Sequence, residues 1–240
     1  KADVSEVLLD GFASCDTHHA ISAFEWTPDG RLVMLEGIAV SSSVETAYGP
    51  MRNRDKSVGW AFDPRNQRLE KHHSPCLINA WCYTHNDWGQ PFLGDGTTAA
   101  QHWATPLTGA YFDERGHNQQ FIHYDGPVMR PALGNGFIYS RHFPDSAQRN
   151  FYFACVINMN GNLQFKVEDD GSGYRGTRVE DLVTSTDRNF RPGDPQIGPD
   201  GALYFIDWHN PLIGHMQYSQ RDPNRDHSHG RIYRISANDR

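Results

Sequence analysis

The stretch FRPGDPQIGPDGALYFIDWHNP, residues 190–211, places a Pro-Asp-Gly turn between two short runs rich in β-branched and aromatic residues. The first run ends at Ile197, the turn is residues 199–201, and the second run is residues 203–206. Asp and Gly supply the backbone conformations that a tight chain reversal needs, and such flanking runs are typical of paired strands. The stretch therefore predicts a β-hairpin.

The same pattern recurs along the chain, while helical periodicity is nearly absent. Copies and outer pairs of short runs are found at residues 22–26 with 32–35, 59–63 with 68–72, 80–84 with 91–93, 150–157 with 163–167, and 231–236. The turns return roughly every 55 to 60 residues, and four-strand repeats of about this length are typical of β-propellers. A β-sandwich would show shorter and more even spacing. We predict an all-β chain holding about four propeller blades.

The family that the motifs below resemble implies more than four blades, and an unclosed ring would expose two sheet edges. We expect residues 1–240 to form a single β-propeller domain that is incomplete on its N-terminal side. The ring would have six blades or a similar number, and a longer polypeptide or a second chain would complete it.

Composition narrows the classes of partner. The 240 residues include 22 basic and 29 acidic side chains, giving a formal net charge of −7. Nucleic-acid binding needs a basic stripe that neutralises phosphates, so we expect no nucleic-acid partner. The longest apolar runs, such as residues 202–206, are far shorter than the about 20 residues that span a membrane. Aromatic residues make up 12% of the chain, and we expect them to supply much of the core.

Propeller geometry predicts where the long polar segments lie. If the Pro-Asp-Gly turns join the first and second strand of each blade, the other long loops share the opposite face. The loops leading into inner strands would be residues 13–20, 74–79, 127–135 and 187–194. The loops between second and third strands would be residues 38–57, 94–120 and 208–230. Function concentrates on loops held by a rigid scaffold, so this face is expected to carry the chemistry.

Asp16-Thr17-His18-His19 is the densest set of chemically active residues near the predicted channel. Imidazole titrates near neutral pH, and an adjacent carboxylate would fix its tautomer, so His18 or His19 could act as a general base. The alternative is a pair of loop histidines hydrogen-bonded to backbone.

Arg191 and Asp194 stand at the start of another predicted inner strand. A guanidinium holds anionic substrate or cofactor groups with two parallel hydrogen bonds. The alternative is a structural ion pair between blades.

Residues 207–229 are unusually rich in His, Asp and Arg. They could bind a metal, but no ligand spacing such as HExxH is present. A self-contained network of Arg–Asp pairs and Asx turns would explain them equally well. The candidates here are Asp207, His209, Asn210, Arg225, His227 and His229.

The chain has four cysteines: Cys15, Cys76, Cys82 and Cys155. None forms a CxxC or CxxCH motif, so we expect no covalent haem in this chain. One or two disulfides in an oxidising compartment and four inert buried thiols both remain open.

Several motifs occur in one order: DTHH (16–19), WTPDGRL (26–32), VETAYG (44–49), WAFDP (60–64), WGQ (88–90), the stretch 190–211, and RDPNRDHSHGRIYRI (221–235). This order strongly resembles the β-propeller domain of the membrane-bound dehydrogenases among the PVC-type haem-binding CxxCH proteins. Those are related to sorbosone and pyrroloquinoline-quinone glucose dehydrogenase propellers. The resemblance covers residues 4–236 and is most specific at the C-terminal end.

The resemblance implies an extracytoplasmic, periplasmic propeller that oxidises a sugar or other alcohol. Electrons would pass to a pyrroloquinoline quinone cofactor, with calcium, or to a cytochrome c module. His18, His19, Arg191 and Asp194 carry over as catalytic candidates: a histidine takes the hydroxyl proton while hydride leaves, and Arg191 orients the acceptor. Substrate- or cofactor-binding candidates are Asp16, Asn79, Asp207, His209, Asn210, Arg225, His227 and His229.

The chain departs from the family pattern in three places. It has no CxxCH segment, residues 130–136 lack a histidine that relatives often carry, and residues 6–11 already resemble an outer strand. Two other functions therefore stay open. One is a non-catalytic propeller that binds glycan or protein. The other is a calcium-dependent lactonase-like hydrolase with Asp16, Asn79 and Asp194 around the metal.

Overall fold

A computed structural model describes residues 2–73, 77–105, 118–123, 128–213 and 221–237. Contacts group the chain into two compact units, Lys1–Ala80 with Ala104–His117, and Trp81–Trp103 with Asn118–Arg240. The described residues are strands and loops, with one 3-10 turn at Asp145–Ala147.

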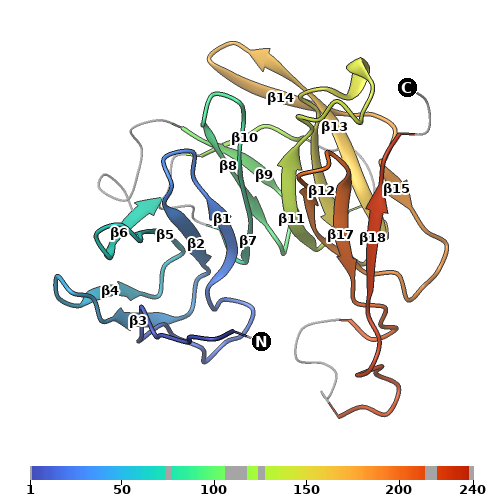
Figure 1. The fold of residues 1–240 in the computed structure, drawn as a ribbon. Coiled ribbons are helices and arrows are strands. Elements are labelled where there is room, and N and C mark those ends of the chain that lie inside the picture. Colours follow the sequence, from blue (N-terminus) through green and yellow to red (C-terminus); the bar gives the residue numbers. More distant parts are fainter. Residues whose placement is uncertain (1, 74–76, 106–117, 124–127, 214–220, 238–240) are drawn as a thin grey trace. The chain divides into compact units, whose positions relative to one another are not determined.

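The first unit holds one antiparallel sheet whose strands follow the order β1-β2-β5-β6 (Figure 1). Its strands are β1 (Ser22–Trp26), β2 (Leu32–Glu36), β5 (Val58–Asp63) and β6 (Arg68–His73). A hairpin of β3 (Ser41–Val44) and β4 (Met51–Arg54) is inserted between the second and third strands. The predicted hairpin at residues 22–35 and the outer pair at 59–72 are confirmed, and the loop predicted at 38–57 contains this inserted hairpin.

Three more sheets follow, again with their strands in chain order. They comprise β7 (Ala80–His85), β8 (Pro91–Asp95), β9 (Gln101–Ala104) and β10 (Asn118–Gln120); then β11 (Ala132–Phe137), β12 (Phe151–Cys155), β13 (Gly161–Asp170) and β14 (Gly173–Arg178); then β16 (Pro192–Ile197), β17 (Leu203–Asp207) and β18 (Arg231–Ile235). The short β15 (Val183–Thr184) also pairs with β13. Sheets of this order are propeller blades. The all-β, four-blade prediction is confirmed.

Two strand predictions were wrong. Residues 94–120 were expected as one loop, but β9 and β10 lie within them, and β14 was not expected at all. All three strands are polar: β9 carries the fully buried Gln101, and β14 reads GYRGTR. Polar side chains removed the apolar signal that marked the other strands.

The first strand of three sheets carries the same irregularity. The register shifts between Ser22 and Glu25 in β1, between Ala132 and Asn135 in β11, and between Gly193 and Gln196 in β16. Each bulge contains a residue with a positive φ: Ala23 at 51°, Gly134 at 78° and Asp194 at 46°. The blades therefore share a repeated backbone feature, the bulge in the first strand, in addition to the Pro-Asp-Gly turns.

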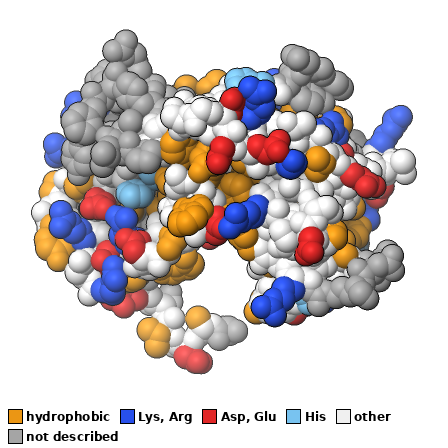
Figure 2. All heavy atoms as spheres, turned by 90° about the horizontal axis from the view of Figure 1, so that it is seen from above, with side chains coloured by type: hydrophobic (Ala, Val, Ile, Leu, Met, Phe, Trp, Pro, Cys, Tyr) orange, Lys and Arg blue, Asp and Glu red, His pale blue; other side chains and the backbone are white. Residues whose placement is uncertain are grey.

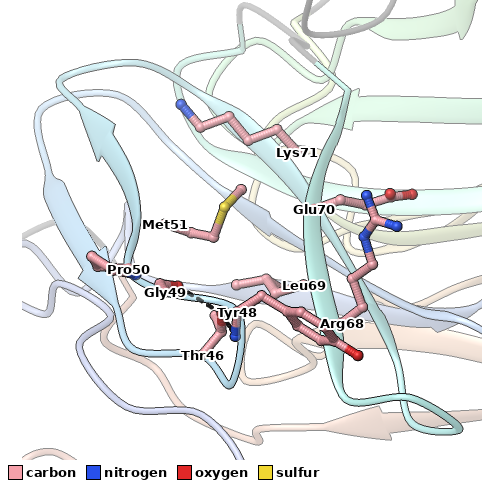
Figure 3. Close-up of a pocket in the computed structure, with 9 residues that line it drawn as sticks. All are labelled: Thr46, Tyr48, Gly49, Pro50, Met51, Arg68, Leu69, Glu70 and Lys71. Carbon is pink, nitrogen blue, oxygen red and sulfur yellow. Dashed lines mark hydrogen bonds between the residues drawn. The ribbon is translucent and has the colours of Figure 1, made fainter.

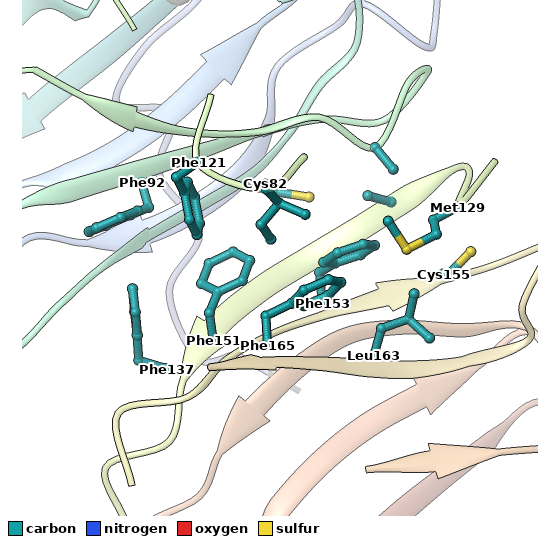
Figure 4. Packing of buried hydrophobic residues seen from close by; sticks show 13 residues of the cluster. Cys82, Phe92, Phe121, Met129, Phe137, Phe151, Phe153, Cys155, Leu163 and Phe165 are labelled. Carbon is teal, nitrogen blue, oxygen red and sulfur yellow. The ribbon is translucent and has the colours of Figure 1, made fainter. Parts of the chain in front are cut away.

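The core of the second unit is aromatic, as the composition predicts (Figure 4). Phe92 and Phe121 meet edge to face at 5.2 Å between ring centroids, and Phe121 meets Phe151 at 5.1 Å in the same geometry. Phe153 and Phe165 stack at 5.4 Å. Aromatic pairs of this kind contribute about 0.5–1.5 kcal/mol each beyond their buried area.

Second strands end at buried acids. Glu36 closes β2, Asp95 closes β8 and Asp207 closes β17, and their exposed fractions are 0%, 3% and 1%. Glu36 accepts hydrogen bonds from Ser42 Oγ (3.0 Å), Asn53 Nδ2 (3.2 Å) and Trp60 Nε1 (2.8 Å). These donors tie the inserted hairpin to the sheet, because a buried carboxylate without partners would be costly.

Gly134 provides a test of this packing. A Cβ there would lie 2.7 Å from the Asp194 Cα and 2.9 Å from the Pro195 Cδ, at a φ of +78°. Gly171 has a similar φ of +63° but open space around it. Alanine in the left-handed backbone conformation costs about 1 kcal/mol at either position. Only in Gly134→Ala does the added methyl group also collide with the neighbouring strand β16. We expect Gly134→Ala to lower the free energy of unfolding by about 2 kcal/mol more than Gly171→Ala in urea titrations. Equal losses would contradict this packing of β11 against β16.

Candidate functional site

The first unit brings Asp16 and His18 together in the loop before β1. His18 Nδ1 lies 3.6 Å from Asp16 Oδ1, and the His18 backbone N–H donates to the same oxygen at 3.0 Å. The side chains are 22% and 28% exposed. The loop is held by His19 N and Ala20 N, which both donate to the Asp16 carbonyl. A carboxylate at this distance stabilises an imidazolium, so the pair suits proton acceptance.

His19 lies beside this pair but is buried, and its Nδ1 has no hydrogen-bond partner among the described residues. Its carbonyl accepts from Gly37 N at 2.9 Å, and a Cβ on Gly37 would lie 3.1 Å from His19 Cα. The buried Asn79 follows Ile78, whose carbonyl accepts from Ile38 N next to Gly37. Asp16, His18, His19 and Asn79 therefore belong to one region of the first unit.

Arg191, in the second unit, is buried and directs its guanidinium at protein oxygens. Nε donates to the Asn210 carbonyl at 3.0 Å, and Nη2 to the Pro211 carbonyl at 3.4 Å. Nη1 lies within 3.4 Å of the Val156 carbonyl and Asn160 Oδ1. Burial lowers the pKa of Arg191. The side chain joins two loops, and these contacts use the donors that an anionic ligand would need.

Asp207 anchors the start of the long loop after β17. Its Oδ1 accepts from Arg191 N at 2.7 Å and from His209 N at 2.8 Å, while Arg231 Nε lies 3.5 Å from Oδ2. Burial raises the pKa of Asp207, and the Arg191 N–H opposes that rise. Arg231 also contacts the His209 ring and Asp187 Oδ2.

The rest of this loop is organised by Asx turns. Asn210 Oδ1 accepts from Leu212 N, Asp222 Oδ1 from Asn224 N, and Asp226 Oδ1 from Ser228 N, all at 2.9–3.1 Å. Asp226 also holds His229 through its Nδ1 at 2.8 Å. Arg225 Nη1 reaches the Leu212 carbonyl at 3.4 Å, and His227 is exposed. This is the self-ordering network that the sequence left open as an alternative to a metal site.

Asp194 is exposed at the bulge of β16, and its Oδ1 accepts from Gln196 Nε2 at 3.3 Å. It lies in the second unit with Arg191, whereas Asp16, His18, His19 and Asn79 lie in the first. The prediction that all these residues share one face stays a prediction.

The quinone and calcium implied by the family resemblance stay a prediction. Arg191 is occupied by protein oxygens, as described above. In the part of the chain that the structure describes, no three His, Cys, Asp or Glu side chains gather in a group that could hold a metal ion. We therefore derive no step through either group.

Two of the described cysteines are inert by environment. Burial raises the pKa of the Cys82 thiol to about 12 and that of Cys155 to about 11. Cys15 is exposed, and all three are free thiols, whereas Cys76 lies outside the described residues. The alternative of four buried thiols therefore fails at Cys15.

The described surface carries both signs of charge. Figure 2 shows basic and acidic side chains interspersed on one face, without a basic stripe. None of the helices in the described ranges has the length and apolar character needed to cross a membrane.

Sequence reasoning did not place the buried acids Glu36 and Asp95 among the candidate residues, although their contacts are as specific as those of Asp207. Asp95 accepts from Thr97 N at 3.3 Å, Thr98 N at 3.1 Å and Thr98 Oγ1 at 2.6 Å. A signal was present: each acid ends an apolar run, in LVMLE, PFLGD and LYFID.

The model of DUF7133, a domain of unknown function, matches residues 1–127 and 128–239. A solved glucose dehydrogenase aligns over 92% of this chain and 61% of its own, at 17% identity and a TM-score of 0.53. A second glucose dehydrogenase aligns over 91% and 64%, at 16% identity and a TM-score of 0.52. The soluble aldose sugar dehydrogenase of Escherichia coli, in its apo form, aligns over 86% and 84%, at 13% identity and a TM-score of 0.44.

This chain thus spans about three fifths of the length of the two glucose dehydrogenases, and it shares their fold. No curated protein sequence matches it.

Asp226 offers a pH test of the loop network. Hydrogen bonds from the Ser228 N–H and His229 lower the pKa of Asp226 from 3.8 to about 2. A carboxyl whose pKa is lowered by folding stabilises the fold above its ordinary pKa, and this contribution is lost as the pH falls toward 2. We expect the Ser228 and His229 amides to lose hydrogen-exchange protection between pH 4 and 2.

Asp226→Asn should speed exchange of these two amides about fivefold at neutral pH, because an amide oxygen accepts more weakly than a carboxylate. Asp222→Asn, in the neighbouring Asx turn, is the control and should leave them unchanged. Wild-type exchange rates in Asp226→Asn would show that this carboxylate does not order the loop.

Proposed function

The chain belongs to the DUF7133 family, and we propose that it is a dehydrogenase-like propeller that oxidises a hydroxyl group of a sugar or other alcohol. The observation that carries the proposal is the partly exposed Asp16–His18 pair in the loop that enters β1. The fold shared with solved glucose dehydrogenases supports it at the level of architecture.

In this proposal His18 accepts the proton of the substrate hydroxyl while a hydride leaves the same carbon for an electron acceptor. Asp16 stabilises the imidazolium that forms, because its Oδ1 lies 3.6 Å from Nδ1. That interaction leaves Nε2 as the nitrogen that takes the proton. The Asp16 carbonyl, which accepts from two backbone N–H groups, fixes the loop so that the pair is preorganised.

The proposal includes a periplasmic location and a cytochrome c module as electron acceptor. Pyrroloquinoline quinone with calcium is the cofactor to be tested. The support for these three elements is the resemblance of the motifs to the CxxCH-associated dehydrogenases. Under the same proposal, the 240 residues are part of one propeller domain.

A second candidate function is a non-catalytic propeller that binds glycan or protein. Two observations favour it: the Arg191 guanidinium donates to protein carbonyls, and Asx turns order the loop after β17. Most of the polar candidate residues then have a structural role. The calcium-dependent lactonase-like alternative needs Asp16, Asn79 and Asp194 on one metal, and metal analysis of the purified protein tests it.

A dye-linked oxidation assay over a panel of sugars and alcohols, with and without added pyrroloquinoline quinone and calcium, tests the proposal. We expect His18→Ala to lower kcat at least about 100-fold, because a positioned general base contributes about 10²–10⁴. Asp16→Asn should lower kcat less than His18→Ala does. It should also lower the apparent pKa of the base relative to wild type, because the negative charge beside the imidazole is lost.

His123→Ala, which removes an exposed histidine from the second unit, is the control and should keep full activity. Full activity in His18→Ala would overturn the assignment. Oxidation by no member of the panel, together with direct binding of a sugar, would favour the non-catalytic alternative.

A further inference from the structure

The hairpin of β3 and β4 in the first unit has one edge that the described residues leave unpaired. The outer edge of β3 is covered, because Ser43 N donates to the Gly11 carbonyl at 3.0 Å. The N–H and C=O of a residue in an antiparallel strand point to the same side, so those of Ser43 face away from β4. Its cross-strand partner Arg52, and Arg54 two residues later, therefore direct their backbone N–H and C=O groups away from β3. These groups form no hydrogen bond within the part of the chain that the structure describes.

The same two residues place two positive charges along this edge. Arg52 and Arg54 are exposed, whereas Asn53 between them is buried. Alternate residues of a strand point to the same face, with Cα atoms about 6.5–7 Å apart, so both arginine side chains stand on one face of the hairpin. Directly opposite on β3 are two exposed hydroxyl groups, those of Ser43 and Ser41. Neither arginine side chain has an ion-pair partner among the described residues.

The buried face of the hairpin holds this edge in place. Ser42 Oγ and Asn53 Nδ2 both donate to the Glu36 carboxylate, at 3.0 Å and 3.2 Å. The backbone N–H of Ala13 donates to Ser42 Oγ at 2.8 Å. The free edge is therefore formed before any partner arrives, and a preformed surface loses less conformational freedom on binding.

Open space adjoins the start of this edge. A groove of about 550 Å³ lies between the turn that leads into β4 and the outer strand β6 (Figure 3). Pro50 and Met51, at the start of β4, line one side of it, and Leu69 on β6 lines the other. A chain laid along β4 therefore has room beside the strand.

The charges on the edge restrict which chain fits it. Charged side chains on an exposed edge usually prevent pairing with other strands. Here both charges are positive, and their spacing is that of alternate residues in an extended chain. Like charges directly across an antiparallel pair destabilise it, whereas opposite charges stabilise it. The edge therefore excludes basic strands and favours an acidic one.

We propose that β4 binds an extended acidic segment of a partner protein as an added antiparallel strand. The backbone of the segment pairs with the free groups of Arg52 and Arg54, as in other cases of strand addition. Two acidic side chains at alternate positions of the segment meet the two guanidiniums. This binding uses none of the residues of the Asp16–His18 pair, so it and the proposed oxidation can fail separately.

Fluorescence anisotropy with the labelled peptide Thr-Glu-Val-Glu-Thr tests the charge requirement on the unmodified protein. We expect this peptide to bind at least about fivefold more tightly than Thr-Gln-Val-Gln-Thr, because two cross-strand pairs of opposite charge form only with the acid. Equal affinity of the two peptides would overturn the proposal, and so would no binding of the acidic peptide at millimolar concentration.

Backbone methylation of the acidic peptide tests strand addition itself. The N–H groups of the two Glu residues would face β4, whereas that of the central Val would face solvent. Methylation of both Glu nitrogens should weaken binding at least about tenfold, because an N-methylated residue has no donor to offer. Methylation of the Val nitrogen should leave the affinity unchanged. Equal affinity of the two methylated peptides would contradict pairing along β4.

Variants locate the edge. Arg52→Gln and Arg54→Gln should each weaken the acidic peptide about threefold and leave the Gln peptide unchanged. Arg141→Gln, which removes an exposed arginine from the second unit, is the control and should bind like wild type. Equal loss in Arg141→Gln would reduce the effect to overall charge and overturn the proposal.

Two further results would assign the edge to another occupant and overturn the proposal. One is dextran sulfate that displaces the acidic peptide equally from wild type and from Arg52→Gln, because a polyanion needs no pairing with the edge. The other is a dimer of the unmodified protein that dissociates in Arg52→Gln, because the occupant would then be a second copy of this chain.

Discussion

A buried carboxylate at the end of the second strand is the constraint on which most of this structure depends. It occurs in three of the four blades, at Glu36, Asp95 and Asp207. A carboxylate removed from water costs several kcal/mol unless donors surround it, so the chain that follows must turn back and supply them. The acid thus fixes the path of the loop between the second and third strands.

The three acids recruit different donors, which suits the different lengths of their loops. Asp95 accepts hydrogen bonds from Thr97 and Thr98, two and three residues further on, and closes a tight turn. Glu36 reaches a side chain of the inserted hairpin at Asn53 and a neighbouring strand at Trp60. Asp207 accepts the Arg191 N–H, and Arg191 then binds the far side of the loop at Asn210. In the third sheet Cys155 takes this position, and backbone N–H groups of residues 157–159 approach its sulfur.

The fold was predictable to the extent that strands were apolar and turns carried Pro-Asp-Gly. The hairpins around Gly30 and Gly201 follow from local chemistry, and the structure places their strands within a few residues of the prediction. The strand β9 was missed because its buried Gln101 is held by a polar contact with Asn135, a partner that local sequence does not reveal.

The site was predictable only in part, for the same reason. Asp16 and His18 are neighbours in sequence, so their pairing could be expected, whereas the donors of Arg191 meet carbonyls at Val156 and Pro211 that only the fold brings near. A residue type alone does not distinguish a ligand-binding guanidinium from one that joins two loops. The many His, Asp and Arg residues after β17 suggested a catalytic or metal site. In the structure, most of those described form hydrogen bonds that order the loop.

The most direct measurement of the central claim is the free energy of unfolding in urea for Glu36→Ala, Asp95→Ala and Asp207→Ala, beside the exposed control Glu168→Ala. We expect alanine at each of the three buried acids to lower the free energy of unfolding by about 2–4 kcal/mol, because removal of the carboxylate leaves two or more donors without an acceptor. Glu168→Ala should cost less than about 0.5 kcal/mol. Losses at the three buried acids no larger than that of the control would contradict the claim that these carboxylates organise the loops.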